Sequence, residues 1–313
     1  MPETLGRRWW PWLVLVPGIL AAGGVLVTLL APWWWKAELA SHWAPHVIVM
    51  TLLAAAVLSR RCPAWAGVLL VVAVVGIMAR LPGGWRPRAP MAEVGIPVAH
   101  GNLFLYNDKQ RRPEAVAAVL AGDPEIVSLV ESVASEDRPR IDLTRYPYQV
   151  WQPQPRRKWR DSVALLSQHP IRAHTVHDAE GQPFLAATLE VHGRPLHVLV
   201  VHTASPANFL MWKHRAEQLQ HVGAVVEALV AQVPAPVLAL GDFNCTPRSP
   251  LWTPLTTAGL LTSGSTPPTW GGWLGIPIDH VLGRDLAIGQ VAAFSIPGSD
   301  HRGLRGVVAW PPR

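Results

Sequence analysis

Asp242 and Asn244 are the residues whose types and spacing first point to chemistry. They follow the apolar run 237–240 in the stretch VLALGDFNCTP at 237–247. The run is typical of a buried strand, and Pro247 prevents that strand from continuing. Residues two apart in an extended chain face the same side, so this carboxylate and carboxamide can together hold a water nucleophile and a phosphate oxygen. The same residues also fit an ordinary turn, and the pair alone does not decide between the two.

Further polar residues lie at or near the ends of other apolar segments. With the first pair, the set is Asn102, Glu131, His202, Asp242, Asn244, Asp279, Asp300 and His301. In layered α/β folds, such residues point into a common cleft. A hard divalent cation prefers oxygen ligands such as Glu131 and Asp300, and it stabilises charge on a phosphoryl group. Histidines and carboxylates donate to phosphate and transfer protons, so the set predicts metal-assisted hydrolysis of a phosphate ester.

The elements that position these residues alternate in the manner of an α/β layered domain. Strands are expected at 96–102, 126–130, 162–167, 184–190, 196–201, 237–240, 278–282, 288–294 and 304–310, and helices at 113–120 and 208–233. The basic run RRKWR at 156–160 fits either a solvated hairpin or contact with phosphates or anionic lipid heads. Trp270 is a candidate for lining the substrate cleft. The histidines at 169, 174, 177, 192 and 197 are expected to be ordinary loop or strand residues.

The N-terminal part is strongly apolar. Runs at 11–31, 45–58 and 64–81 are bounded by tryptophans or arginines and predict three transmembrane helices. Residues 1–81 would then be a membrane anchor, 82–95 a linker and 96–313 a catalytic domain. A signal peptide would explain the first run alone, and buried helices of a soluble domain are the other alternative.

The distribution of charged residues bears on the substrate and on the orientation of the chain in the membrane. From Leu81 onward the chain has 21 basic and 19 acidic residues, which is not the basic footprint of a nucleic-acid-binding domain. The basic residues beside the apolar runs divide equally between the two sides of a membrane. The N-terminal arginine pair favours a cytoplasmic N-terminus. Three spans across a bacterial inner or plasma membrane would then place the catalytic domain outside the cytoplasm.

Seven short motifs, in matching order and spacing, resemble the endonuclease/exonuclease/phosphatase superfamily over residues 95–313. They are HGN at 100–102, IVSLVES at 126–132, LLSQHPI at 165–171, VVHTASP at 200–206, LGDFNCTP at 240–247, IDHVL at 278–282 and SDHRG at 299–303. The apolar N-terminal part further resembles a membrane-anchored bacterial branch of that family. The chain departs from the common pattern at Val130, where the family often has glutamine, and at the His-Gly pair before Asn102.

The resemblance implies a fold and a metal site. The fold is a four-layered α/β sandwich, in which two β-sheets lie between helices. The cofactor is Mg²⁺ or Mn²⁺, with Glu131 as its main ligand and Asn102 and Asp300 beside it.

The resemblance also implies catalytic roles. Asp242 orients or deprotonates the attacking water, and Asn244 holds the water and the phosphate. His202 stabilises the transition state from the phosphate side, and Asp279 orients the second essential histidine, His301. Water attacks phosphorus in line, without a covalent enzyme intermediate.

These observations predict a membrane-anchored, divalent-metal-dependent phosphoesterase, with a nuclease or other phosphodiesterase favoured. The alternatives are a sphingomyelinase-like or phosphoinositide phosphatase activity, and a catalytically inactive membrane-tethered binding protein. The expected partners are a nucleic-acid or lipid head-group substrate and the bilayer, and no protein partner is evident.

Overall fold

The computed structural model describes residues 6–79, 85–86, 95–108, 110–132, 140–152, 163–179, 182–263 and 266–310. The chain divides into two compact units, one of residues 1–83 with 247–250 and one of residues 84–246 with 251–313. The basic run at 156–160 and most of the predicted linker at 82–95 lie outside the described residues.

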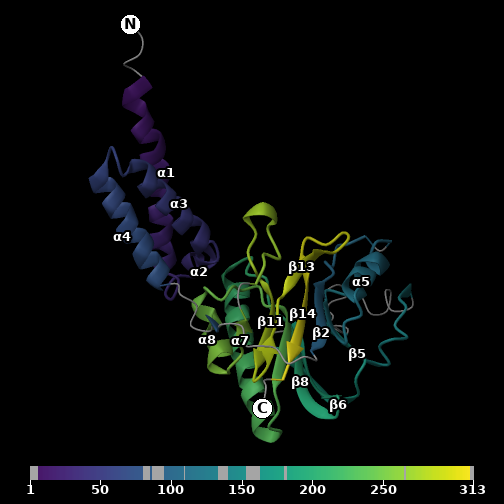
Figure 1. The fold of residues 1–313 in the computed structure, drawn as a ribbon. Coiled ribbons are helices and arrows are strands. Elements are labelled where there is room, and N and C mark those ends of the chain that lie inside the picture. Colours follow the sequence, from purple (N-terminus) through teal and green to yellow (C-terminus); the bar gives the residue numbers. More distant parts are fainter. Residues whose placement is uncertain are drawn as a thin grey trace. The chain divides into compact units, whose positions relative to one another are not determined.

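The described part of the first unit contains four helices (Figure 1). They are α1 (Gly6–Leu29), α2 (Trp35–Ser41), α3 (Ala44–Leu58) and α4 (Pro63–Ala79). Small residues allow the helices to pack closely: a Cβ added at Gly76 of α4 would lie 2.5 Å from Val25 of α1. Other sides of these helices expose large apolar side chains, such as Leu13 at 74% and Met78 at 67%.

The prediction of three transmembrane helices at 11–31, 45–58 and 64–81 is wrong. Among the described residues, only α1 has a segment long and apolar enough to cross a membrane, at Trp12–Leu29. The helix α3 reaches that length only together with α2, across a bend of 68°. The helix α3 has 15 residues and α4 has 17, which are below and at the lower end of the about 17–25 residues of a spanning helix.

In the described part of the second unit, seven strands form a mixed sheet with the order β12-β14-β2-β3-β5-β4, and β13 pairs with β14. The strands are β2 (Ile96–Asn102), β3 (Ile126–Val130), β4 (Tyr148–Gln152), β5 (Val163–Ser167), β12 (Ala287–Ile288), β13 (Ala292–Ser295) and β14 (Arg302–Ala309). The strands β2 and β3 are parallel, and the other pairs are antiparallel.

Five other described strands form a second mixed sheet with the order β11-β9-β8-β7-β6. They are β6 (Ile171–Ala179), β7 (Gln182–Val191), β8 (Arg194–His202), β9 (Val237–Asp242) and β11 (Asp279–Arg284). Only β8 and β9 are parallel in this sheet. Two short strands, β1 (Trp85–Arg86) and β10 (Thr262–Ser263), pair with each other.

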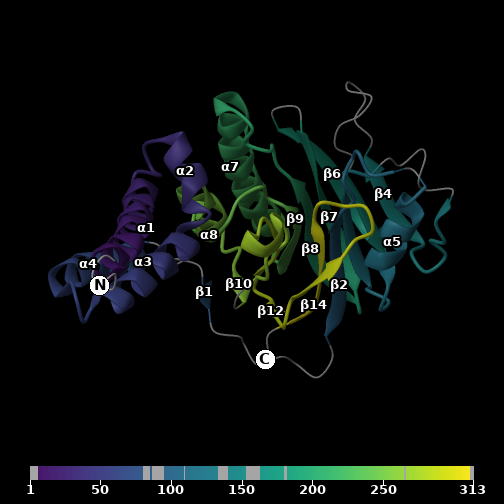
Figure 2. The same cartoon turned by 90° about the horizontal axis from the view of Figure 1, so that it is seen from above.

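The apolar faces of the two sheets pack against each other, with residues such as Val98, Leu165, Leu185 and Leu240 fully buried between them. The outer face of the seven-stranded sheet packs on α5 (Arg112–Leu120). The outer face of the other sheet packs on α7 (Phe209–Gln232) and α8 (Thr253–Thr257). Figure 2 shows α7 and α8 on one side of the sheets and α5 on the other. The predicted sandwich of two sheets between helices is confirmed.

Two local differences from the predicted elements have simple causes. The strand expected at 288–294 is divided into β12 and β13, with residues 289–291 between them. The strands β4 and β6 were not expected, and both are edge strands. In β6, exposed polar residues such as Arg172 and His174 leave no alternating apolar pattern.

Gly241 allows a close contact between two strands of the five-stranded sheet. A Cβ at this position in β9 would lie 1.9 Å from the carbonyl oxygen of Val201 in β8. No side chain fits there, so the glycine lets β8 and β9 run side by side up to their polar ends.

Candidate active site

The strand register brings the ends of four strands together. Asn102 ends β2 and Glu131 directly follows its parallel neighbour β3. In the other sheet, His202 and Asp242 are register partners at the ends of the parallel strands β8 and β9. Asp279 begins the antiparallel strand β11 directly opposite Asp242. Because the two sheets face each other, the carboxyl ends of both parallel pairs meet at one edge of the sandwich.

Asn102 links the two carboxylates that face each other across the sheets. Its Nδ2 donates to Glu131 Oε1 at 3.0 Å and to Asp242 Oδ2 at 3.1 Å. The amide of Leu105 donates to Glu131 Oε2 at 2.7 Å. Burial raises the pKa of Glu131, but His202, the Leu105 amide and Asn102 together lower it below its ordinary value. Glu131 is therefore an ionised carboxylate that is 20% exposed.

Two histidines lie beside these carboxylates. His202 Nε2 is 3.5 Å from Glu131 Oε1 and 3.9 Å from Asp242 Oδ2, and His301 Nε2 is 3.8 Å from the same Asp242 oxygen. Burial and the charge of Asp279 raise the pKa of Asp242 to about 6, against the opposing effect of the two histidines. A carboxylate with a pKa close to neutrality is suited to accept a proton.

Asp279 accepts hydrogen bonds from two histidines. Its Oδ2 accepts from His301 Nδ1 at 2.9 Å, and its Oδ1 accepts from His100 Nε2 at 3.0 Å. Burial lowers the pKa of His301, but Asp279 and Asp242 raise it to about 10, so the imidazole is protonated at neutral pH. Burial raises the pKa of Asp279, but His301 and His100 lower it well below its usual range.

His100 is a site residue that the sequence did not reveal. It is fully buried, and its Nδ1 lies 3.0 Å from the Ser128 hydroxyl in the neighbouring strand. Because an ionised Asp279 can only accept, the His100 Nε2 atom carries a proton. The histidine was visible in the HGN motif, but its partner Asp279 is 179 positions away in the chain.

Asn244 differs locally from the extended conformation expected from the sequence. The strand β9 ends at Asp242, and Asn244 has a φ of 45°, in the left-handed region that asparagine tolerates. Its backbone amide donates to Asp242 Oδ1 at 2.8 Å, and its side-chain Nδ2 donates to the carbonyl of Thr203 at 2.9 Å. The guanidinium of Arg215, which is fully buried in α7, donates to the Asn244 carbonyl. The turn thus keeps Asn244 beside Asp242 by hydrogen bonds rather than by strand alternation.

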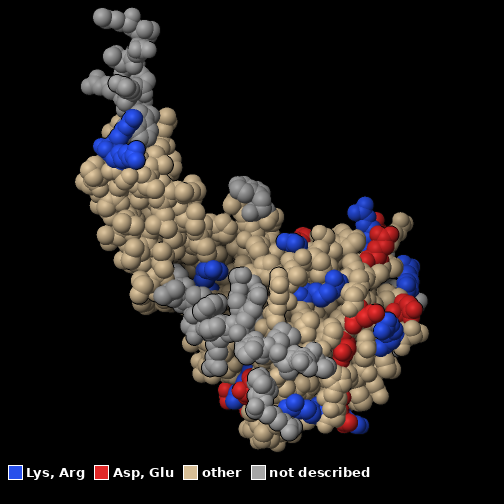
Figure 3. Space-filling model, viewed as in Figure 1, with Lys and Arg blue, Asp and Glu red and all other residues tan. Residues whose placement is uncertain are grey.

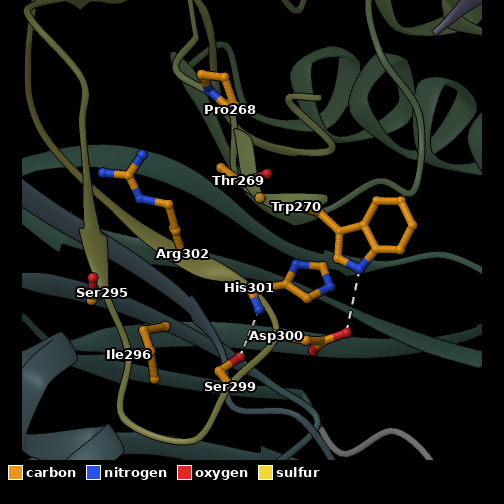
Figure 4. Close-up of a pocket in the computed structure, with 10 residues that line it drawn as sticks. Pro268, Thr269, Trp270, Ser295, Ile296, Ser299, Asp300, His301 and Arg302 are labelled. Atoms are coloured by element: carbon orange, nitrogen blue, oxygen red, sulfur yellow. Dashed lines mark hydrogen bonds between the residues drawn. The ribbon is translucent and has the colours of Figure 1, made fainter. Parts of the chain in front are cut away.

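Asp300 and Trp270 lie together at the rim of a cavity of about 170 Å³, shown in Figure 4. The Trp270 indole donates from Nε1 to Asp300 Oδ2 at 3.3 Å, and His301 and Arg302 line the same cavity. Asp300 directly precedes His301, and its charge contributes to the raised pKa of His301. Ser299, the residue before Asp300, donates to the Asn102 carbonyl at 2.8 Å, so Asp300 lies at the edge of the group that Asn102 connects. The predicted residues His202, Asn244, Asp279 and His301 join that group through contacts with Glu131, Asp242 or one another.

The donor set fits a hard divalent cation. Glu131 and Asp242 offer carboxylate oxygens that converge on one amide nitrogen of Asn102, and such oxygens are the preferred ligands of Mg²⁺ and Mn²⁺. Asp242, Asp279 and His301 also have ligand atoms within 4.8 Å of one another. Both oxygens of Asp279 accept from imidazoles, whereas Glu131 Oε1 and Asp242 Oδ2 face each other and share one hydrogen-bond donor, the Asn102 amide, so Glu131 and Asp242 are the better-placed carboxylates.

A sandwich of two mixed sheets, with this polar set at the ends of its parallel strands, defines a class of hydrolases that act on phosphate esters. The sequence matches the endonuclease/exonuclease/phosphatase family model over residues 99–301, and the chain belongs to that family. None of the curated protein sequences matches this chain significantly.

Three solved structures show the same fold at low sequence identity. The catalytic domain of human nocturnin with bound sulfate is 17% identical, covers 72% of this chain and 99% of its own, and has a TM-score of 0.58. A Staphylococcus aureus beta toxin mutant with bound magnesium ions is 15% identical, with coverages of 68% and 99% and a TM-score of 0.52. Sphingomyelinase C from Streptomyces griseocarneus is 18% identical, with coverages of 69% and 99% and a TM-score of 0.50.

Proposed function

We propose that this protein is a Mg²⁺- or Mn²⁺-dependent phosphodiesterase that cleaves nucleic acid. The main support is the connected set of Asn102, Glu131, His202 and Asp242, with the Asp279–His301 pair beside it. Glu131 and Asp242 would hold the cation through their carboxylate oxygens, with Asn102, whose Nδ2 donates to both, beside them. When bound, the cation supplies positive charge that stabilises the phosphoryl group in the transition state.

The protein groups provide the proton transfers. Asp242 orients a water molecule and accepts its proton while the water oxygen forms a bond to phosphorus. The bond from phosphorus to the leaving oxygen breaks, and His301, kept protonated by Asp279, gives its Nε2 proton to that oxygen. His202 donates to a phosphate oxygen, and Asn244 orients the phosphate and the water. The products are a phosphomonoester and an alcohol.

The cavity beside the site favours a nucleic-acid substrate. Trp270 is 38% exposed, and it shares the cavity lining with the exposed cation Arg302 and with His301. An exposed indole can stack on a base, with a contribution of about 1–3 kcal/mol per base. An adjacent guanidinium is suited to contact phosphate.

A lipid head-group substrate is the second candidate. The specific observation in its favour is the apolar helix α1, in which Trp12, Leu13 and Leu20 expose 58%, 74% and 70% of their surfaces. On the face of the second unit seen in Figure 3, acidic and basic side chains are interspersed. An enzyme attached to a bilayer would meet phosphodiesters of head groups at a high local concentration.

We also propose that α1 attaches the protein to a membrane, with its N-terminus in the cytoplasm and the catalytic unit on the other side. The segment Trp12–Leu29 is 18 residues long and has a mean hydropathy of 2.2. After carbonate extraction of cells that express the full chain, the protein should remain with the membrane, and external protease should digest the catalytic unit in spheroplasts. Release into the soluble fraction would exclude the anchor, and protection from protease would reverse the topology.

Cleavage of supercoiled plasmid by the full-length protein in mild detergent tests the activity. With Mg²⁺ or Mn²⁺ the plasmid should be nicked, and EDTA or His202→Ala should abolish the nicking. His174→Ala, which changes an exposed histidine of β6, is the matched control and should keep it. If the folded protein leaves the plasmid intact but releases head groups from vesicles of sphingomyelin or phosphatidylcholine, the lipid candidate replaces the nuclease. If it binds these substrates without turnover, the protein is a binding protein.

A further inference from the structure

A second cluster of metal-ligating side chains lies at the opposite edge of the sandwich. Glu125 directly precedes β3, His169 lies between β5 and β6, and His192 lies in the turn between β7 and β8. Glu125 adjoins the seven-stranded sheet, whereas His192 adjoins the five-stranded sheet. His169 lies on the segment through which the chain passes from one sheet to the other. The cluster therefore joins the two sheets at one place.

The three ligand atoms are close enough to share one ion. Glu125 Oε2 is 2.5 Å from His169 Nε2 and 3.6 Å from His192 Nε2, and all three residues have ligand atoms within 4.8 Å of one another. Two ligands that are each about 2.0–2.1 Å from a tetrahedral zinc ion are separated by about 3.3 Å. Glu125 and His169 would separate by less than about 1 Å to admit the ion. His192, which is 48% exposed, can approach from the turn.

The backbone around the cluster is held firmly. The Ser167 hydroxyl donates to the carbonyl of His169 and accepts from its amide, at 2.8 and 2.9 Å. The amide of Gln168 donates to the carbonyl of Glu125 at 3.0 Å. His192 has a φ of 50°, and Gly193 follows with a φ of 74°, as in a two-residue hairpin turn that usually has asparagine at the first position. A histidine thus occupies a left-handed position and its ring meets that of His169, with centroids 5.0 Å apart.

This cluster is separate from the candidate active site, and it has a different donor chemistry. Glu125 and Glu131 lie at opposite ends of β3, and six residues of extended chain span about 20 Å. Two imidazoles and one carboxylate suit Zn²⁺, whereas Mg²⁺ prefers oxygen ligands. A fourth position toward solvent would be open to water.

We propose that Glu125, His169 and His192 form a zinc site that fastens the two sheets together at the edge opposite the catalytic residues. The site is independent of the proposed phosphodiesterase activity. Its effect is structural, because an ion that binds only the folded chain stabilises that state.

Zinc binding by the full-length protein in the presence of millimolar Mg²⁺ tests the proposal. Because millimolar Mg²⁺ competes for the proposed oxygen-rich catalytic site, equilibrium dialysis against micromolar Zn²⁺ should still find one zinc ion per chain. The thermal unfolding midpoint should rise by about 5 °C with that ion. A zinc ion that Mg²⁺ displaces would belong to the catalytic edge, and this result would overturn the proposal.

Three variants and one control identify the ligands. His169→Ala, Glu125→Gln and His192→Asn should each lose the bound zinc and the zinc-dependent rise in the unfolding midpoint. Asparagine at 192 is suited to the left-handed backbone, so the metal-free His192→Asn variant should fold as well as the wild type. His174→Ala removes an exposed histidine of β6 and should keep both zinc effects. If the three variants retain the zinc ion and the rise, these residues do not form the site.

Discussion

Replacement of Asp279 by asparagine is the sharpest test of the catalytic arrangement. The carboxylate is fully buried and accepts hydrogen bonds from His301 and His100. Asp279→Asn keeps the shape of the side chain but removes the charge that holds His301 protonated and oriented. The variant should therefore lose both catalytic rate and stability, and the loss of stability should depend on pH in a defined direction.

The magnitude follows from His301. Its pKa lies at about 10 instead of 6.5, and each pKa unit corresponds to about 1.4 kcal/mol, so the protonated form is stabilised by at most about 5 kcal/mol. The lowered pKa of Asp279 describes the same attraction and is not added to it. Asp242 supplies part of the effect, and the substitution removes the desolvation of a buried carboxylate. We therefore expect a destabilisation of about 3 kcal/mol near neutral pH, the size typical of a broken buried ion pair.

The sign of the pH dependence comes from the raised pKa of His301. A group that binds its proton more tightly in the folded state stabilises that state fully below its unfolded pKa, here 6.5. The stabilisation is lost as the pH rises through about 10. The difference in stability between the wild type and Asp279→Asn should therefore be large at neutral pH and should shrink toward pH 10.

The assays are thermal unfolding in EDTA, so that metal binding does not contribute, and metal-dependent hydrolysis of a phosphodiester. The unfolding midpoint of Asp279→Asn should fall by about 8 °C near neutral pH. The kcat should fall by about 10²–10⁴-fold, which is the usual contribution of a positioned acid or base. Asp285→Asn is the control, since Asp285 is 74% exposed and its left-handed backbone accommodates asparagine. If Asp279→Asn keeps its kcat, or if its instability does not shrink toward pH 10, the reasoning about His301 is refuted.

Three other substitutions test the positions of the surrounding elements. Gly241→Ala should prevent the second unit from folding, because the new Cβ would lie 1.9 Å from the carbonyl of Val201, and a native far-ultraviolet circular dichroism spectrum with normal yield would contradict this. Asn208→Ala removes the side-chain acceptor that caps α7 and should lower the free energy of unfolding by about 1 kcal/mol; an unchanged midpoint in urea would show that the cap is dispensable. Arg215→Met removes the hydrogen bond to the Asn244 carbonyl and should lower kcat by about 10–100-fold by displacing the catalytic turn; a normal kcat in a folded variant would argue against that role.

The sequence by itself determined the family, most of the strands and helices and the residue types at the strand ends. These features are local: apolar periodicity reports which segments are buried, and turn residues such as those after Leu240 report where a strand stops. The gathering of polar residues at one edge follows from them, whereas the two-sheet sandwich followed from the resemblance of the ordered motifs to the family. The prediction of a three-helix membrane anchor was wrong, because apolar composition does not determine where each helix bends or ends.

Only the tertiary structure decided which distant residues meet. The pairing of His100 with Asp279 depends on the register of strands in two different sheets and joins positions that are 179 residues apart. Glu125, His169 and His192 come together only because β3, the β5–β6 connection and the β7–β8 turn end at the same edge. Local patterns of hydrophobicity and turn chemistry do not specify such partners, because side-chain contacts across a sandwich depend on how its sheets are paired and packed.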